Sequence, residues 1–311
     1  MNRLLVNLPI IIFFAVLIAM MAALHGFRKY RRSKGLRAPF TQKLLRIPGQ
    51  TLLHRLDKLN AEINVYLIYI FVLPLITYAT ILSHWVYTGI KPHLLQRSVL
   101  SIICLAFVGY SLFKLMKLLS YRRNIRLGYE GELVVGQELH KLQLEGYRIY
   151  HDFPADKFNI DHIVVGSNGV FTVETKTRSK PTSKNRSADA TVTYDGRGLY
   201  FPKATDFQTI EQAEQQADWL SNWLTRAIGD PLAVRAVVAL PGWFVKRTSS
   251  DGIPVVNPKQ FSSLFAHIKP RHLPESMLAR INHQLEQKCR DIVPAGLQIE
   301  EHPAGGKPDI I

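Results

Sequence analysis

Two carboxylates and one amine lie close together in the segment Asn159-Ile-Asp-His-Ile-Val-Val-Gly-Ser-Asn-Gly-Val-Phe-Thr-Val-Glu-Thr-Lys-Thr177. They belong to Asp161, Glu174 and Lys176. Carboxylate oxygens suit hard divalent cations such as Mg²⁺, and an amine beside them can stabilise negative charge or orient a water molecule. Charged groups in a mostly apolar segment are costly to bury without a purpose. The pattern therefore predicts a metal-dependent site, with an ordinary buried ion pair as the alternative.

The same segment has the pattern of a β-hairpin, which decides whether these side chains meet. Apolar residues alternate on both sides of Gly166-Ser-Asn-Gly169, which supplies the turn. Side chains alternate between the faces of a strand, so Glu174 and Lys176 share one face. A four-residue loop places Asp161 opposite Glu174, and a two-residue loop, Asn168-Gly169, places it opposite Lys176. Both registers keep the three charged groups on one face.

This arrangement resembles the Asp, Glu-x-Lys core of the PD-(D/E)xK nucleases and, more narrowly, the nuclease-related domain (NERD) family. The resemblance extends from Gly128 to about Leu240, roughly a third of the chain. The family commonly has Asn-Pro a few residues before its last motif, and Asp206-Phe-Gln-Thr-Ile210 stands there in this chain. The four motifs, in the family's order, are Gly128-Tyr-Glu-Gly-Glu132 at a helix start, Ile160-Asp-His-Ile-Val-Val165, Gly169-Val-Phe-Thr-Val-Glu-Thr-Lys176, and Gln212 on a later helix.

The resemblance implies a fold and a chemistry. The fold is an α/β, restriction-endonuclease-like core of the PD-(D/E)xK type, with its elements in the order αβββαβ. Mg²⁺ or Mn²⁺ would be held by Asp161 and Glu174, and Lys176 would orient or help deprotonate the attacking water. Glu132 would add a ligand directly or through water, and Gln212 would bind substrate or water. For these two residues the alternatives are an acid that is favourable near a helix N-terminus and a residue on a helix surface.

Hydrophobic periodicity and turn residues independently predict the same order of elements in the globular half. We expect residues 120–293 to form the nuclease-like domain with a C-terminal extension, and residues 294–311 to form a flexible tail. The main predicted elements are a helix at Tyr129–Glu145, a strand at Arg148–Phe153, the two hairpin strands, a helix at Thr209–Ala227 and a strand at Ala233–Leu240.

Apolar, uncharged segments precede this domain. A membrane-spanning helix needs roughly 20 mostly apolar residues, with a lower limit near 17. We therefore expect one transmembrane helix in residues 1–26, a basic cytoplasmic loop over residues 27–62, and two further transmembrane helices with a short external loop in residues 63–119. A cleaved signal peptide is the alternative for the first, but most cations follow that segment instead of preceding it. The apolar segments are Leu8–Leu24, Ile63–Leu82 and Ser98–Phe113.

Positive charge is distributed unevenly around these segments. Ten Lys or Arg residues lie between the first two segments and two between the second and third. Cytoplasmic loops carry the excess of Lys and Arg. We therefore expect a multi-pass protein of a bacterial-type inner (plasma) membrane, with its N-terminus outside and the nuclease-like domain in the cytoplasm. Residues 124–311 contain 22 basic and 22 acidic residues, so the net charge of +15 reflects topology and the lipid bilayer rather than nucleic acid.

One local cluster of cations nevertheless supports a nucleic-acid partner. It follows the second hairpin strand, in a loop rich in Ser, Thr, Pro and Asn, and it could track a phosphate backbone. A solvated flexible loop is an equal alternative. The cluster comprises Arg178, Lys180, Lys184 and Arg186.

The sequence as a whole predicts a membrane-anchored, metal-dependent nuclease, a hydrolase acting on phosphodiester bonds of cytoplasmic nucleic acid, with DNA preferred over RNA. The alternative is a non-catalytic, membrane-tethered module that keeps the nuclease fold and binds nucleic acid or protein. The zero net charge of residues 124–311 favours the module, and the presence of all three site residues favours the enzyme. A transport function is disfavoured because the apolar segments contain no Asp, Glu or Arg. Formation of a homo-oligomer stays open.

Overall fold

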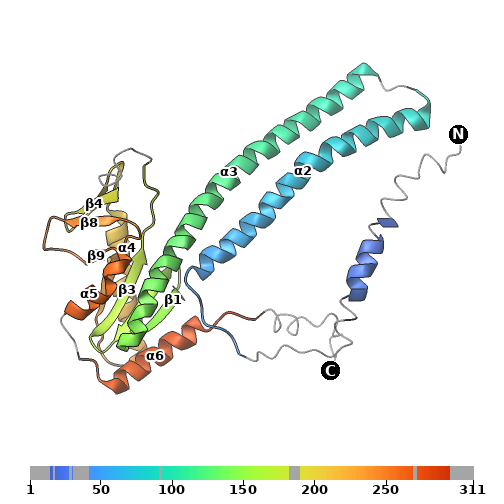
Figure 1. Ribbon diagram of the computed structural model, residues 1–311. Coiled ribbons are helices and arrows are strands. Elements are labelled where there is room, and N and C mark those ends of the chain that lie inside the picture. The colour runs from blue at the N-terminus through green and yellow to red at the C-terminus, as the bar shows by residue number, and fades with distance from the viewer. Residues whose placement is uncertain are drawn as a thin grey trace. The chain divides into compact units, whose positions relative to one another are not determined.

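The structure is a computed structural model that describes residues 42–90, 93–181, 190–268 and 272–294, together with residues 15, 16, 18–27 and 30. The described chain divides into two compact units. One unit is built on Leu59–Tyr121, and the other combines Gln42–Lys58 with Arg122–Val293. Two helices, α2 (Gln50–Thr88) and α3 (Leu94–His140), lead from one unit into the other (Figure 1).

The first unit contains the apolar parts of α2 and α3. By length and composition, both helices are long and apolar enough to cross a membrane. They contain two of the three segments expected to span the bilayer. The third, Leu8–Leu24, lies partly outside the described residues, and its described part belongs to a shorter apolar helix, Ile18–Phe27. Within the unit the rings of Tyr69 and Phe107 pack edge to face, with centroids 5.7 Å apart.

The helices differ in extent from the sequence-based expectation. α2 begins at Gln50 instead of near Ile63, so the end of the expected loop over residues 27–62 is helical. α3 runs without a break into the segment where a separate helix was expected to begin at Tyr129. The reason is that residues 114–128 are rich in Leu, Lys and Arg and contain no proline. Strong helix formers of this kind make continuation cheaper than a break.

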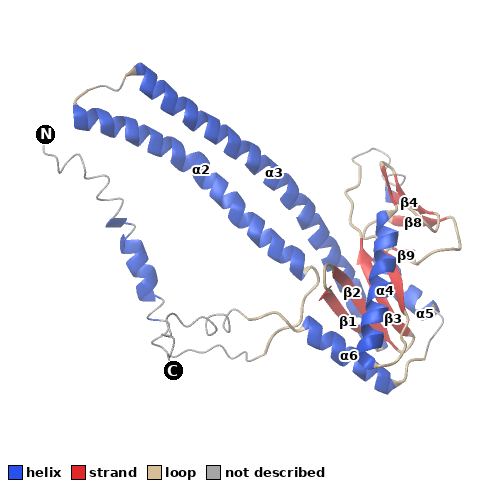
Figure 2. Ribbon diagram, turned by 180° about the vertical axis from the view of Figure 1, so that it is seen from behind, coloured by secondary structure: helices blue, strands red, loops and turns tan. Residues whose placement is uncertain are grey.

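A five-stranded sheet forms the centre of the second unit, in the order β1-β2-β3-β7-β9. The first three strands form an antiparallel meander, and β7 and β9 add parallel to β3 and β7 (Figure 2). The strands are β1 (Arg148–Pro154), β2 (Asn159–Gly166), β3 (Gly169–Thr175), β7 (Val234–Ala239) and β9 (Val255–Val256).

A smaller four-stranded sheet has the order β6-β5-β4-β8. Three of its strands lie between β3 and the second long helix of the domain, α4 (Gln208–Ile228), and the fourth follows β7. Its strands are β4 (Thr191–Tyr194), β5 (Leu199–Phe201), β6 (Ala204–Asp206) and β8 (Phe244–Arg247).

Helices cover both faces of the larger sheet because its strands are apolar on both sides. Ile163 of β2 packs in one core cluster with Leu220 and Leu224 of α4. Its neighbour Val164 packs in another cluster with Leu139 of α3. The remaining helical elements are η1 (Lys141–Glu145), η3 (Pro258–Gln260), α5 (Phe261–His267) and α6 (Glu275–Cys289). Among the larger sheet and its two long covering helices, the order α3, β1, β2, β3, α4, β7 follows the predicted αβββαβ order in a mixed α/β fold, with β4, β5 and β6 inserted between β3 and α4.

The hairpin between β2 and β3 has the register of the four-residue-loop alternative. Val165 pairs with Val170, and Gly166 pairs with Gly169 as the last rung, which leaves Ser167 and Asn168 at the tip. Continued along both strands, this register brings Asp161 opposite Glu174. Gly169 has a φ of +134°, a conformation that glycine adopts without steric penalty. The register that pairs Asp161 with Lys176 is therefore not the one formed.

Candidate functional site

Asp161 and Glu174 meet where β2 and β3 diverge. Asp161 is partly buried, and its Oδ2 accepts a hydrogen bond of 2.8 Å from the backbone N–H of Thr175. The Glu174 carboxylate accepts one hydrogen bond from Gln212 Nε2, 2.9 Å to Oε1, and another from Gln216 Nε2, 2.8 Å to Oε2. Both glutamines lie on α4, so the helix that covers this face of the sheet also holds the glutamate.

Glu132 approaches the same place from α3. It is 7% exposed, and its carboxylate accepts a hydrogen bond from the backbone N–H of Gly49. The glycine at position 131 lets α3 lie close to the chain that leaves β3, because a Cβ atom there would collide with the side chain of Thr177. The Glu132 Oε2 atom is buried and has no hydrogen-bond partner among the described residues. Three carboxylates from a helix and two strands therefore influence one another.

These three carboxyl groups are held without full charge compensation. Burial, followed by repulsion from Asp152 and Glu174, raises the pKa of Glu132 to about 8. Burial and repulsion from Glu174 and Glu132 hold the pKa of Asp161 well above its ordinary value. Burial raises the pKa of Glu174 to about 7, although the bond from Gln216 and the charge of Lys176 oppose that rise. A cation placed among them would remove the repulsion.

Lys176 lies beside this cluster, but its amine pairs with a different carboxylate. Its Nζ atom is 3.4 Å from Asp206 Oδ2, and Arg178 Nη2 is 2.8 Å from the same oxygen. The other oxygen of Asp206 accepts a 3.0 Å hydrogen bond from the N–H of Thr209 in the first turn of α4. These three interactions, with Arg178 contributing most, lower the pKa of Asp206 to about 2 despite its burial. Asp206 therefore fixes both cations and the start of α4.

A second acidic position, Asp152, lies on β1 next to the site. It adopts a φ of +47° and is 3% exposed. Its Oδ2 accepts hydrogen bonds from Arg46 Nη1 at 2.8 Å and from the Thr51 hydroxyl at 2.7 Å, and its Oδ1 accepts one from Asn159 Nδ2 at 3.0 Å. Arg46 also binds Asp291 through two hydrogen bonds, of 2.7 and 2.8 Å. Arg46 is one of the ten Lys or Arg residues between the first two apolar segments. It is thus a structural residue of this domain as well as a part of the charge asymmetry.

Three residues that contact the site residues were not predicted from the sequence, although the spacing of two of them could have indicated their role. Gln216 follows Gln212 by four residues, a spacing that places both on one helix face. Asp206 precedes Thr209 by three residues, a spacing typical of an acid that caps a helix start. Gly49, whose N–H binds Glu132, lies far outside the family motifs and leaves no such signal.

The predicted nucleic-acid cluster is only partly visible. Arg178 binds Asp206, and its guanidinium lies 4.9 Å from the centre of the Phe201 ring. Lys180 lies with its amine 5.8 Å from the centre of the Trp243 ring. Lys184 and Arg186 lie outside the described residues. The two described members of the cluster therefore lie in the chain that leaves β3, and Arg178 contacts the four-stranded sheet through Phe201 and Asp206.

The residues fit a hard divalent cation by donor type. Asp161, Glu174 and Glu132 offer carboxylate oxygens, which Mg²⁺ and Mn²⁺ prefer, and their repulsion is of the kind a cation relieves. Within the described part of the chain, no three His, Cys, Asp or Glu side chains converge in the tight grouping of a formed metal site. The oxygens of Asp161 and Glu174 are instead turned to backbone and glutamine donors. The donor set is present, and Asp161 and Glu174 would have to exchange these hydrogen-bond donors for a cation.

The family comparison agrees with the geometry. Residues 127–241 match the model of the nuclease-related domain family, NERD. The match begins in α3, ends just after β7, and includes all five residues expected to carry the chemistry. The resemblance carried by the four sequence motifs is therefore confirmed over this stretch. No curated protein and no solved structure matches the chain significantly.

Proposed function

We propose that the chain is a membrane-anchored, metal-dependent phosphodiesterase of the nuclease type that acts on nucleic acid, with DNA preferred over RNA. One observation carries the proposal. Three carboxylates, Glu132, Asp161 and Glu174, repel one another in a nuclease-related domain, and none of them forms an ion pair among the described residues, while Lys176 and Arg178 are held by Asp206. Metal-dependent phosphodiester hydrolysis needs carboxylates that are free to bind a divalent metal and cations nearby that stabilise the charge of the phosphate.

Each residue of the site has a distinct task in this proposal. Asp161 and Glu174, with Glu132, would hold Mg²⁺ or Mn²⁺, which supplies a Lewis acid that polarises the phosphoryl group. The Thr175 N–H fixes the orientation of the Asp161 carboxylate, and Gln212 fixes that of Glu174.

The two cations complete the site. Lys176 and Arg178 would neutralise the phosphate charge, and Lys176 would also orient the attacking water. Burial of the carboxylates keeps bulk water out and strengthens these electrostatic interactions.

The apolar helices support a membrane location. Phe71, Leu75 and Leu105 are 74%, 66% and 70% exposed in the structure. A helix that is apolar around its circumference and does not bury its side chains in protein is typical of a membrane span. With the charge asymmetry of the loops, we infer a multi-pass protein of the inner (plasma) membrane whose nuclease-related domain faces the cytoplasm. The third span, in residues 1–26, remains part of this proposal.

The test is cleavage of fluorescent DNA and RNA oligonucleotides by the full-length protein in detergent, with Mg²⁺, with Mn²⁺ or with EDTA. We expect cleavage that requires a divalent cation, is lost in Asp161→Asn, and is reduced at least 100-fold in Lys176→Ala, as for loss of a group that stabilises charge. Asp156→Asn is the matched control, because Asp156 is exposed in the turn between β1 and β2. Wild-type protein without activity under any of these conditions would favour the binding module.

The binding module is the second candidate, and a specific observation favours it. The acids have not gathered into a metal site within the described residues, and both cations are occupied by Asp206. A module of this kind would bind oligonucleotide in EDTA as well as in Mg²⁺ and leave it intact. Binding that strengthens with Mg²⁺ and weakens in Asp161→Asn would count against it.

A further inference from the structure

A groove lined by positively charged side chains adjoins the acidic site. Its cavity volume is about 360 Å³. One wall is the early part of α3 within the second unit, and the other is the chain that leaves β3 together with the turn between β5 and β6. The side chains used in the argument are Asn124, Leu127, Arg178, Lys180, Lys203 and Trp243.

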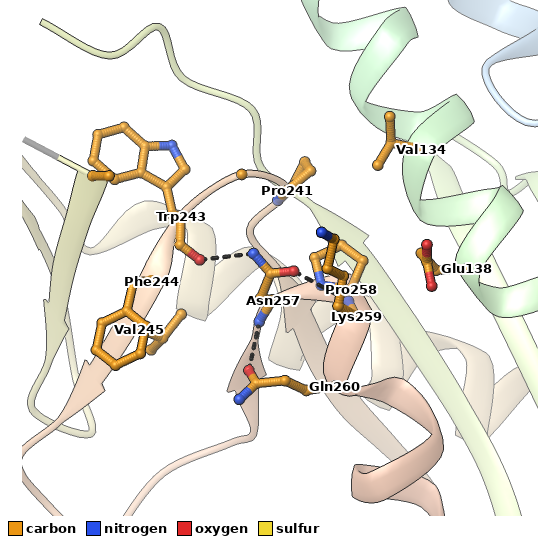
Figure 3. Close-up of a pocket in the computed structure, with 12 residues that line it drawn as sticks. Val134, Glu138, Pro241, Trp243, Phe244, Val245, Asn257, Pro258, Lys259 and Gln260 are labelled. Atoms are coloured by element: carbon orange, nitrogen blue, oxygen red, sulfur yellow. Dashed lines mark hydrogen bonds between the residues drawn. The ribbon is translucent and has the colours of Figure 1, made fainter. Parts of the chain in front are cut away.

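The lining of this groove differs from those of three other pockets that the described residues form. It contains three cations, Arg178, Lys180 and Lys203, and no acidic residue. The pocket beside η3 combines Glu138 with Lys259 (Figure 3), and the other two also mix acids with arginine. Since residues 124–311 contain as many acids as bases, this groove is a local concentration of positive charge in a domain with no overall excess.

The groove runs directly into the candidate site. Asn124 and Leu127 lie on the same face of α3 as Gly131 because they are spaced by three and four residues. Gly131 packs against Thr177, which also lines the groove. The next residue of α3 is Glu132, and the residue before Thr177 is Lys176. A chain lying in the groove would therefore reach the carboxylates within about one helical turn.

The cations of the groove are positioned by aromatic rings on its floor. Arg178 lies over Phe201 and Lys180 over Trp243, so part of the entropy cost of ordering these side chains is already met by the fold. Arg178 shares its charge with Asp206, whereas Lys180 and Lys203 are exposed and form no ion pair among the described residues. Two lysines are thus available for an anion that extends beyond the site.

We propose that this groove binds the phosphodiester backbone of one nucleic-acid strand and guides it to the Asp161 and Glu174 site. The proposal rests on the function proposed above and names its substrate-binding surface. The positive charges of the lining fit a polymer with regularly spaced phosphates. The rings of Phe201 and Trp243 on the apolar floor are buried and leave no exposed face for a base to stack on. Recognition is therefore of the backbone and independent of base sequence.

The test separates binding from cleavage. Full-length protein is placed in phosphatidylcholine nanodiscs with EDTA, and the anisotropy of a labelled 20-nucleotide single strand is measured between 50 and 300 mM KCl. The variant is Lys180→Gln/Lys203→Gln. The matched control, Lys157→Gln/Lys259→Gln, removes the same charge from exposed positions outside the groove.

We expect the groove variant to lower affinity about tenfold to thirtyfold at 0.1 M salt, because a single-strand phosphate contact contributes about 0.7 to the slope of log affinity against log salt. That slope should fall by roughly 1.4 in the groove variant. The control should match wild type. Groove and control variants with equal affinity would overturn the proposal. Binding of the same variants to phosphatidylserine vesicles is measured in parallel, and a groove variant that keeps oligonucleotide binding but loses vesicle binding would also overturn it.

The outcome for the groove is distinguishable from that for the enzyme. Loss of binding in the groove variant, together with a wild type that never cleaves, leaves the groove standing and overturns the nuclease. Metal-dependent cleavage that the groove variant retains at wild-type substrate affinity leaves the nuclease standing and overturns the groove.

Discussion

Two aspartates on neighbouring strands are treated in opposite ways by this fold. Asp152 on β1 and Asp161 on β2 lie between the paired rungs His151–His162 and Phe153–Ile160. Asp152 is bound by Arg46 and by the polar side chains of Thr51 and Asn159. Asp161 has a single backbone N–H and is surrounded by other acids.

The difference separates a structural acid from a functional one. The cation beside Asp152 compensates its charge, and its partners tie together the start of α2, β1, β2 and the chain after α6. Asp161 is partly buried and repelled by Glu174 and Glu132 without such a partner, which opposes folding, so its presence is explained by a task and not by stability. The following changes test this distinction through the free energy of unfolding, from the largest expected effect to the smallest.

Arg46→Ala should destabilise the domain most. Its side chain is 15% exposed and that of Asp152 is 5% exposed, so the change leaves a buried carboxylate without its cation. Loss of one partner of a buried pair costs about 3–5 kcal/mol. Urea unfolding in detergent measures this, with tryptophan fluorescence as the signal in a Trp85→Phe background, because the other three tryptophans lie in the second unit.

Arg126→Ala provides the control for that measurement. Arg126 pairs with Glu130 at 2.8 Å on α3, but the two side chains are 60% and 52% exposed. Such exposed pairs contribute only about 0.3–0.5 kcal/mol. A comparable loss in both variants would contradict the view that the Asp152 cluster has a special structural role.

Acid should destabilise the domain through the neighbouring rung, His151–His162. His151 hydrogen-bonds to His140 at 2.9 Å and to His162 at 2.8 Å. Burial, and then the charge of His140, lower the pKa of His151 to about 3, from 6.5. The unfolded chain therefore binds the extra proton between these values, and stability falls as the pH falls through this window.

From pH 6.5 to pH 5, His151 alone should account for a loss of about 1.7 kcal/mol. Replacement by Gln keeps hydrogen-bonding capacity and should make the loss shallower by about 1.1 kcal/mol for each pH unit on average over this range. Unfolding curves at pH 6.5, 6 and 5 measure the slope. His283→Gln, on the exposed side of α6, is the control and should retain the wild-type slope. An unchanged slope in His151→Gln would contradict its burial as a neutral side chain.

Asp206→Asn should have an intermediate effect of about 1 kcal/mol. The carboxylate is 5% exposed, but its partners Lys176 and Arg178 are 32% and 34% exposed, so solvent screens part of the attraction. Asparagine keeps the oxygen that binds the N–H of Thr209. Asp218→Asn on the exposed face of α4 is the matched control. A loss as large as that of Arg46→Ala would show that Asp206 is a second structural acid.

Asp161→Asn should have the smallest effect on stability. Its side-chain oxygen still accepts the N–H of Thr175, while a charge repelled by Glu174 and Glu132 is removed. We expect the unfolding free energy at pH 8 in EDTA to remain within about 0.5 kcal/mol of wild type or to rise, since replacing an uncompensated, partly buried charge by a neutral group is often neutral or stabilising. A loss of several kcal/mol would place Asp161 in the same class as Asp152.

The sequence by itself determined the hairpin and the acids that it carries. Alternation of apolar residues, the glycines at the turn and the family motifs are local patterns, and side-chain direction on a strand follows from them. That is why Asp161 and Glu174 could be assigned to one face before the register was known, and why the αβββαβ order was predicted correctly. The extent of α3 was not determined in this way, because a helix that continues and one that restarts have similar compositions.

Only the tertiary structure decided which charges are compensated. Arg178 and Asp206 are 28 residues apart, Gln216 and Glu174 are 42 apart, and Arg46 and Asp152 are 106 apart. Pairings over such separations depend on how helices pack on the sheet, and no local periodicity encodes them. Hydrophobic burial selects that packing, and the packing then leaves Asp152 with a cation and Asp161 without one.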